Sequence, residues 1–274
     1  MEVNIEVYVY PTDSMAFSNN MERQQWETTT VIRSALYQFV KKNGYMPKDL
    51  HILNQPFPNN YLSELPKDPY TLKNNATTSP NGDGGWLFSP VEIAFDSDLI
   101  SAVKEALKPN IPFDNNISFM PLFISIDKEN HLLAVMSGNR IMRRYSVAVG
   151  ENDTTPEGTL NISKKVMNPD KIVPISDNVY GTRAMELSNL NYAVHGTNTP
   201  SSIGKDVSQG CIRLNNSDME DLYSIIPLNT SVRIFKNLTT LKGFTNPDIS
   251  NKGLFTQSNN SKEEDNSKLY HWGG

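Results

Sequence analysis

The chain has 274 residues, of which 38% are hydrophobic and 20% charged, and its net charge at pH 7 is −5. This balance is typical of a protein that folds around its own hydrophobic core. A negative net charge without a cluster of Lys and Arg argues against nucleic acid as the main partner. No apolar run approaches the roughly 20 residues of a membrane-spanning helix, and the opening "MEVNIEVYVYP" alternates instead of forming a signal-peptide core. We therefore expect no transmembrane segment and see no export signal.

Residues 1–112 predict a small α+β accessory domain. Apolar residues alternate over residues 3–9 as in a strand, and they recur at helical spacing over 31–40, before Gly44 and Pro47. A second helix is predicted from Asp96 to Leu107, with Asp96 or Ser97 as N-cap. The stretch "IRSALYQFVKKNGYMP...YLSELPKDPY...GGWLFSP", within residues 28–90, is similar to the globular part of type II secretion pseudopilins. That resemblance implies a domain type and not filament assembly.

Residues 115–236 predict a mainly β domain, either a sandwich or barrel-like. "LFISIDKENHLLAVMSGNRIMRRYSVAVG" reads as three strands, with Tyr145, Val147 and Val149 alternating along the third. Further strands are expected in "TPEGTLNI", "TRAMELS", "YAVH" and "TSVRIF". Ser217 and Glu220 predict a capping box at the start of one helix. Residues 237–274 predict a polar, partly disordered tail, whose end "LYHWGG" could dock back onto the domain.

Cys211 is the only cysteine, and the four histidines are scattered along the chain. These counts exclude an internal disulfide and leave little for a metal site, so we expect neither a metal nor a cofactor. A lone thiol is either a small buried hydrophobic group or a nucleophile. Because a free thiol has a pKa near 8.5, a nucleophilic cysteine needs a base beside it. His195, which ends the apolar run "YAV", is the candidate, and the Gly- and Ser-rich segment that follows can return Cys211 to hydrogen-bonding reach of its ring.

Small residues around the thiol predict an oxyanion hole. A glycine directly before a nucleophile lets successive amides face one space, so the candidate donors are the N–H groups of Gln209, Gly210 and Cys211. If the segment is extended, Arg213 projects to the same side as Cys211, which suits a substrate that carries carboxylates. The alternative for Arg213 is an ion pair with Asp218 or Asp221.

The string "YAVHGTNTPSSIGKDVSQGCIRLNNSDMEDL" resembles the signature of the YkuD-type L,D-transpeptidases, which runs His-Gly-Thr/Ser, a spacer, and Ser-x-Gly-Cys-x-Arg/Asn. The resemblance extends to "TPEGTLNI" and "YGTRAMELS" and covers residues from about 119 to 236. Two positions depart from the pattern: Gln209 stands where many relatives have a histidine, and Leu160 where they have Phe or Tyr.

The resemblance implies an L,D-transpeptidase fold and a role for each matching residue. Cys211 would be the nucleophile and His195 the general base and later acid. A backbone carbonyl from the region of Gly196 and Thr197 would orient the imidazole. Ser208 would shape the loop together with the glycine before the cysteine. The guanidinium of Arg213 would hold polar or anionic parts of the substrate.

The reaction implied by the resemblance is cross-linking of peptidoglycan, outside the membrane and in the cell wall. The cysteine would form an acyl-enzyme with a stem peptide, release the terminal D-alanine and pass the acyl group to an amine as a 3→3 cross-link. Carbapenem-type β-lactams would acylate the same thiol. Two alternatives stay open: an L,D-carboxypeptidase that uses water, and a non-catalytic wall-binding or assembly module. The sequence does not identify the donor diamino acid, the acceptor, the role of residues 1–112 or the oligomeric state.

Overall fold

The computed structural model describes residue 17 and residues 19–80, 83–111, 118–170, 178–238, 254–255, 261–267 and 269–272. The strand predicted over residues 3–9 lies outside these ranges. None of the helices within them combines the length and apolar content that a bilayer crossing requires.

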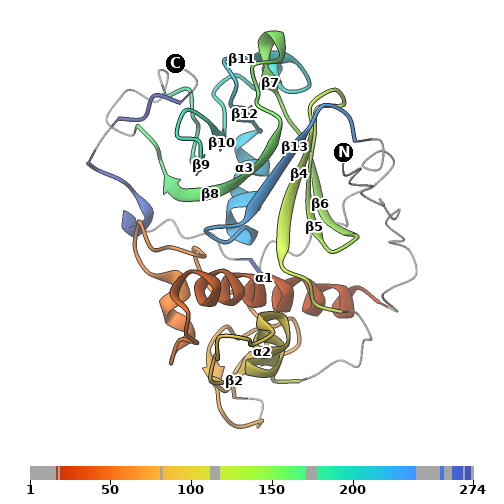
Figure 1. Ribbon diagram of the computed structural model, residues 1–274, viewed down its shortest axis with the longest axis vertical. Helices are drawn as coiled ribbons and strands as arrows, with labels where there is room; N and C mark the ends of the chain where they lie inside the picture. The colour runs from red at the N-terminus through yellow and green to blue at the C-terminus, as the bar shows by residue number, and fades with distance from the viewer. Residues whose placement is uncertain are drawn as a thin grey trace.

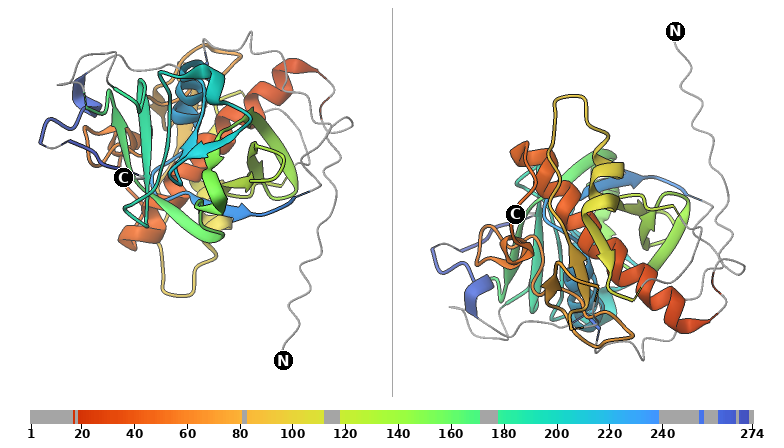
Figure 2. Two further views of the ribbon diagram at one scale, coloured as in Figure 1. Left: turned by 90° about the horizontal axis from the view of Figure 1, so that it is seen from above. Right: turned by 90° about the horizontal axis from the view of Figure 1, so that it is seen from below.

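An eight-stranded sheet forms the centre of the molecule (Figure 1). Its order is β12-β10-β9-β8-β13-β4-β5-β6, and β10–β12 and β13–β4 are its parallel pairs. A bridge between Ala148 and Arg213 joins its two ends, so the sheet curls on itself (Figure 2). The predicted mainly β, barrel-like domain is therefore confirmed. The strands are Leu122–Asp127 (β4), Leu132–Ser137 (β5), Arg140–Ser146 (β6), Gly158–Met167 (β8), Arg183–Leu187 (β9), Ala193–His195 (β10), Ile212–Arg213 (β12) and Ser231–Phe235 (β13).

The strand predicted in "TSVRIF" is confirmed as β13, and its side chains alternate between core and solvent. In β13, Val232 and Ile234 are buried while Arg233 between them is exposed. The third strand of the predicted meander, however, ends at Ser146 and does not continue to Val149. The short strand β7 (Val149–Gly150) instead pairs in parallel with β11 (Asp206–Ser208) as a separate two-stranded sheet. The chain leaves the main sheet there and approaches the loop before Cys211.

Helix α1 (Asn20–Asn43) packs between the large sheet and the rest of the N-terminal region (Figure 1). It confirms the helix predicted over 31–40 and ends where predicted, at Gly44, which adopts φ 78°. Its buried Glu27 accepts two hydrogen bonds from Arg143 of β6, at 2.8 and 2.9 Å, which ties the helix to the sheet through a paired charge.

The remaining N-terminal elements cover the other side of α1. They are helix α2 (Leu99–Ala106) and a three-stranded sheet of β1 (Ala76–Thr77), β2 (Trp86–Phe88) and β3 (Leu107–Pro109). The predicted N-cap of α2 was wrong. The N-cap is Asp98, not Asp96 or Ser97, and its carboxylate accepts a hydrogen bond from the N–H of Ile100. One hydrophobic cluster runs from Trp86 through α1 to the large sheet. The domain boundary predicted between residues 112 and 115 falls outside the described ranges and stays a prediction.

Helix α3 (Asn216–Ile225) packs against β9. The predicted capping box was wrong, because the N-cap position is Asn215 and its side chain makes no capping hydrogen bond. The Glu220 carboxylate instead accepts a hydrogen bond from the Thr182 hydroxyl, at 2.8 Å. Glu220 thus ties the helix to the segment before β9.

Part of the predicted tail packs on the domain. We call residues 261–267 and 269–272 the C-terminal segment. Glu263 is fully buried and accepts hydrogen bonds from Asn60 (2.9 Å) and Ser63 (3.2 Å). Farther along, Tyr270 and Trp272 are buried and stacked, with ring centroids 4.2 Å apart. This packing agrees with the expectation that "LYHWGG" docks back onto the domain.

Candidate active site

Strands β10 and β12 bring His195 and Cys211 to one face of the sheet. They pair in parallel with Val194 beside Ile212 and His195 beside Arg213, which places Ala193 beside Cys211. Because side chains alternate along a strand, the ring, the thiol and the guanidinium then share one face. The register of two short strands thus brings together three of the residues singled out from the sequence.

His195 has a fixed ring orientation. Its Nδ1 lies 2.5 Å from the carbonyl oxygen of Gly196, the residue that the family resemblance implied. The ring is only 2% exposed, and burial lowers the pKa of His195 to about 4. The imidazole is therefore neutral at pH 7, and donation from Nδ1 leaves Nε2 as an acceptor. This is the form that a general base requires.

Cys211 is held as a thiol. Its side chain is 3% exposed, and burial raises the pKa of Cys211 to about 11, although the N–H of Ala193 and the charge of Arg213 act in the opposite direction. The sulfur accepts a hydrogen bond from that N–H at 3.4 Å. The predicted hydrogen bond between the His195 ring and Sγ is not formed among the described residues. The buried pair is therefore neutral on both sides in this closed arrangement.

The loop before Cys211 is held by two hydroxyl groups. Ser208 Oγ accepts from the N–H of Gly210 at 3.1 Å and donates to the carbonyl of Cys211 at 2.6 Å. Thr155 Oγ1 donates to the carbonyl of Gly210 at 2.9 Å. Of the three predicted oxyanion donors, the Gly210 N–H is thus occupied. No described residue accepts a hydrogen bond from the N–H of Gln209 or Cys211.

Arg213 carries a donor that is not used internally. Its Nε is buried, and no described residue accepts a hydrogen bond from it. Of the two alternative ion pairs, the one with Asp221 is not formed, because the Asp221 carboxylate accepts from the Tyr145 hydroxyl at 2.7 Å and lies 3.6 Å from Arg143 Nε. The one with Asp218 stays a prediction. Because Arg213 shares the face of Cys211, a carboxylate or carbonyl of a ligand beside the thiol would satisfy this donor.

Asn216 supports the turn after His195, and sequence reasoning missed it. Its Oδ1 accepts from the N–H of Thr197 at 3.1 Å and from that of Thr182 at 3.3 Å. A side chain at Gly196 would place its Cβ 2.2 Å from this oxygen, so any other residue there would displace the Asn216 side chain from these hydrogen bonds. The one signal for Asn216 in the sequence was that it follows closely after Cys211, in the string "CIRLNN".

An aromatic group covers the site, and sequence reasoning missed this as well. The ring of Tyr180 contacts that of His195 edge to face, with centroids 5.0 Å apart, and that of Trp272 at 4.9 Å. The Tyr180 hydroxyl donates to the Trp272 carbonyl at 3.2 Å, and the indole N–H donates to Glu186 at 3.1 Å. Cys211 belongs to the same hydrophobic cluster as Tyr180 and Trp272. The C-terminal segment therefore packs on the residues that enclose the thiol.

Comparison with known proteins finds matches to the part of the chain that contains His195 and Cys211. Residues 121–234 match the YkuD family model, described as the L,D-transpeptidase catalytic domain. The putative L,D-transpeptidase YkuD of Bacillus subtilis (strain 168) is 36% identical over 136 residues, which are 49% of this chain and 77% of that protein. The putative L,D-transpeptidase YqjB of the same organism is 37% identical over 123 residues, 41% of this chain and 70% of that protein.

Two solved structures are similar to part of this chain. The catalytic domain of the E. faecium L,D-transpeptidase has 19% identity and a TM-score of 0.35, covering 42% of this chain and 96% of that one. L,D-transpeptidase 3 from Mycobacterium tuberculosis, in complex with a faropenem-derived adduct, has 16% identity and a TM-score of 0.36, covering 41% of this chain and 59% of that one.

Proposed function

This chain belongs to the YkuD family of L,D-transpeptidases, and from that premise we propose that it cross-links peptidoglycan stem peptides through an acyl-enzyme on Cys211. The observation that carries the proposal is the shared face of β10 and β12, where the thiol lies diagonally across from a neutral imidazole. A thiol and a base in that relation are the parts that covalent acyl transfer needs.

In the first step the Sγ–H proton moves to Nε2 of His195 while the sulfur attacks the carbonyl between the third stem residue and the terminal D-alanine. A bond forms between the sulfur and the carbonyl carbon, and the oxygen becomes an oxyanion. The N–H of Cys211, with that of Gln209, would donate to this oxygen, as neither is bonded to a described residue. Breaking the carbon–nitrogen bond releases D-alanine, whose amine takes the proton from His195, and a thioester remains.

In the second step an acceptor amine attacks the thioester. His195 takes a proton from that amine and returns it to the leaving sulfur, which restores the thiol and leaves an amide as a 3→3 cross-link. Water in place of the amine would give the L,D-carboxypeptidase outcome from the same site. Arg213 would bind a carbonyl or carboxylate of the stem peptide through its unused Nε. Since this substrate lies outside the membrane, the protein would act there.

The described conformation is closed to a substrate of this size. Cys211 is only 3% exposed and offers little of its sulfur to a carbonyl carbon, so the proposal requires residues that cover Cys211 to move before acylation. Water admitted by that movement would also lower the pKa of the thiol from its raised value, because burial is the main cause of the shift. Opening would therefore both admit the substrate and favour the thiolate.

The experiment that tests the proposal is intact-mass analysis after incubation with meropenem, alongside chromatography of disaccharide-tetrapeptides. The expected results are a covalent adduct on the wild type and none on Cys211→Ala, together with dimers formed by release of D-alanine. Tripeptides without dimers would instead indicate the carboxypeptidase. If Cys211→Ala keeps its turnover, or if the wild type neither forms an adduct nor alters the tetrapeptide, Cys211 is not the nucleophile of a peptidoglycan enzyme.

A further inference from the structure

Thr155 is a buried residue that bonds directly to the loop before Cys211. It is 1% exposed, and both capacities of its hydroxyl are used: it accepts from the N–H of Gly150 at 2.7 Å and donates to the carbonyl of Gly210 at 2.9 Å. The hydroxyl thus joins the short strand β7 to the loop that carries the thiol. Nothing in the proposed reaction uses Thr155 as a reactant.

The carbonyl that Thr155 holds belongs to the same peptide unit as the N–H of Cys211. That unit is planar, and in its trans form the carbonyl and the N–H point in opposite directions. A donor that fixes the direction of the Gly210 carbonyl therefore fixes the direction of the Cys211 N–H on the other side of the unit. This N–H is the oxyanion donor assigned above, and no described residue accepts from it.

The peptide unit needs such a hold because it follows a glycine in an unusual conformation. Gly210 has φ 129°, a region that other residues rarely adopt. A Cβ there would lie 2.4 Å from the ring of Tyr192, so no side chain can be added to stiffen the position. The orientation of the unit depends on its hydrogen bonds, of which the Thr155 hydroxyl supplies the one to the Gly210 carbonyl.

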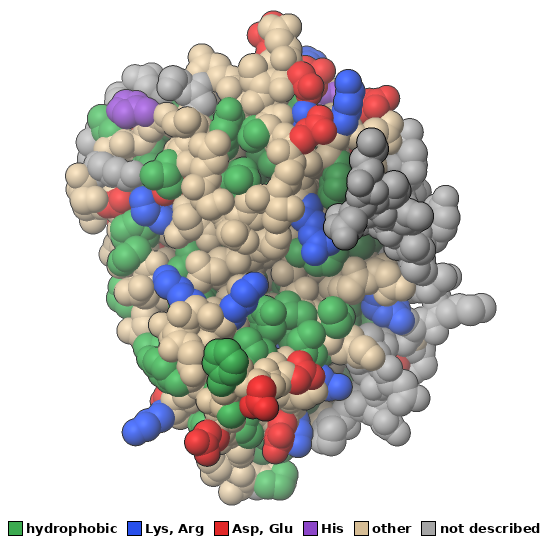
Figure 3. Space-filling view, in the orientation of Figure 1, with side chains coloured by type: hydrophobic (Ala, Val, Ile, Leu, Met, Phe, Trp, Pro, Cys, Tyr) green, Lys and Arg blue, Asp and Glu red, His purple; other side chains and the backbone are tan. Residues whose placement is uncertain are grey.

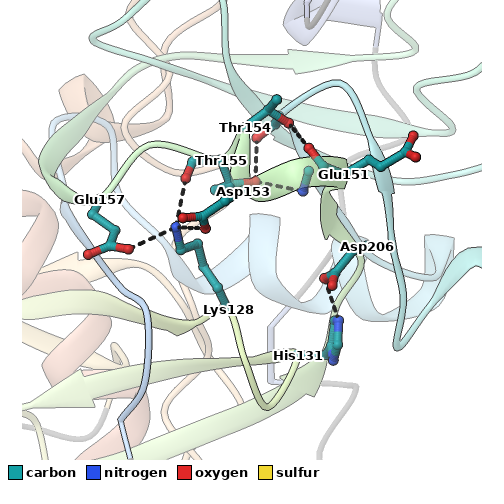
Figure 4. Close-up of polar contacts among 10 residues, drawn as sticks. Lys128, His131, Glu151, Asp153, Thr154, Thr155, Glu157 and Asp206 are labelled. Atoms are coloured by element: carbon teal, nitrogen blue, oxygen red, sulfur yellow. Dashed lines mark hydrogen bonds and ion pairs between the residues drawn. The ribbon is translucent and has the colours of Figure 1, made fainter.

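Thr155 is itself anchored by Lys128, from the turn after β4 (Figure 4). The Lys128 ammonium donates to the Thr155 carbonyl at 3.1 Å and to Asp153 at 2.5 Å, and it lies 3.0 Å from Glu157. Burial acts to lower the pKa of Lys128, but the two carboxylates raise it above its ordinary value, so the anchor stays charged. In Figure 3, acidic and basic side chains gather at the end of the molecule where Figure 1 places β7.

We propose that Thr155 is a positioning residue for the oxyanion hole, which orients the Gly210–Cys211 peptide unit so that the Cys211 N–H faces the substrate carbonyl. The inference rests on the proposed function, because it assigns a role in acylation of Cys211. It predicts that the hydroxyl of Thr155 matters for attack on a carbonyl group and not for the reactivity of the sulfur itself.

Two reagents separate these effects. Meropenem acylates a thiol through an oxyanion, whereas iodoacetamide alkylates it by displacing iodide and forms no oxyanion. Thr155→Val keeps the shape of the side chain and removes the hydroxyl, and Thr155→Ser keeps the hydroxyl. We expect acylation of Thr155→Val by meropenem to slow by about 10- to 100-fold, with alkylation within about twofold of wild type. Thr155→Ser should restore acylation to within a few-fold.

Thr154→Val provides the matched control, because Thr154 is exposed and, among the described residues, its hydroxyl donates to the Glu151 carbonyl and to none of the groups of the Cys211 loop. Its acylation should equal that of the wild type. Equal losses of acylation and alkylation in Thr155→Val would mean general damage to the loop and would overturn the proposal, as would a Thr155→Ser variant as slow as Thr155→Val. A wild type that is alkylated but never acylated would overturn the proposed function instead.

Discussion

The two sides of the Cys211 loop are held by different kinds of interaction. On one side, which we call the polar side, the hydroxyls of Thr155 and Ser208 make buried hydrogen bonds to backbone groups on either side of the thiol. On the other, the aromatic side, Tyr180, Tyr270 and Trp272 pack by their rings and enclose the thiol. Hydrogen bonds fix direction, whereas ring contacts mainly exclude water. The polar side therefore sets the geometry of the site, and the aromatic side sets access to it.

The energies of the two sides also differ. A buried donor or acceptor that loses its partner costs about 1–3 kcal/mol, so removing a hydroxyl with two partners is expensive. An aromatic pair adds about 0.5–1.5 kcal/mol beyond its buried area. Separation of the aromatic side also breaks the hydrogen bonds from Tyr180 to the Trp272 carbonyl and from the Trp272 indole to Glu186, but groups that separation exposes can bond to water instead. The aromatic side can thus separate from the site at lower cost than the polar side can.

Ser208→Ala should give the largest effect. It leaves the Gly210 N–H and the Cys211 carbonyl without their hydroxyl partner, so we expect the free energy of unfolding to fall by about 2–4 kcal/mol. Ser224→Ala is the matched control, since that buried hydroxyl donates to one helix carbonyl, and its loss should stay below about 1 kcal/mol. Urea denaturation measures both. Equal losses would show that the loop does not depend on the Ser208 hydroxyl.

Trp272→Ala should change access to the thiol, with a smaller effect than Ser208→Ala on the loop that carries Cys211. The indole covers Tyr180 and the cluster that contains Cys211, so its removal admits water and reagent. We expect alkylation by iodoacetamide at pH 8 to rise about tenfold, because each unit by which the thiol pKa falls raises the thiolate fraction about tenfold at a pH below that pKa. Unfolding temperature, measured in parallel, should fall, because the substitution removes a buried ring that stacks on Tyr270 and takes the indole N–H away from Glu186.

The dependence of the alkylation rate on pH shows in which direction Trp272→Ala moves the pKa of Cys211. Burial raises the pKa of Cys211 to about 11, so alkylation of the wild type should keep rising well above pH 9. In Trp272→Ala the midpoint should move down toward the pKa of a free thiol, about 8.5. Tyr45→Ala removes an exposed aromatic residue far from this cluster in the sequence and serves as the control. A Trp272→Ala midpoint equal to that of the wild type would show that the aromatic side does not shield the thiol.

Local patterns predicted much of the sheet, and the reason is physical. Alternation in β13 and the turn residues between β4 and β5 are properties of neighbours along the chain, so they can be read directly. The closing bridge between Ala148 and Arg213 and the pairing of Val149 with Asp206 join distant segments. Alternation through Tyr145 and Val147 gave no sign that the strand ends at Ser146.

The same distinction applies to the site. His195, Gly196 and Cys211 were found from one contiguous string, and their shared face follows from strand register. The occupied N–H of Gly210 could not be predicted, because it depends on which way the Ser208 hydroxyl turns in three dimensions. Thr155 stood in the quoted "TTPEG" stretch with no signal for its bond to a carbonyl 55 positions away. The packing of Trp272 on Tyr180 depends on the path of the C-terminal segment across the sheet.

His131→Ala should give the smallest effect and sharpens the account of the polar side. His131 lies in the same turn as Lys128, and its Nε2 is 2.8 Å from the carboxylate of Asp206 at the start of β11. The pair is partly exposed, with 23% and 61% of the side chains accessible, so solvent screens it and its loss should cost less than about 1 kcal/mol. Acylation by meropenem should stay within about threefold of wild type, because the hydroxyls of Thr155 and Ser208 still hold the loop. Urea denaturation and the acylation rate measure the two effects, and His51→Ala, an exposed histidine with no ion pair among the described residues, is the control. A loss as large as that of Ser208→Ala would mean that this surface pair, and not the buried hydroxyls, holds the polar side in place.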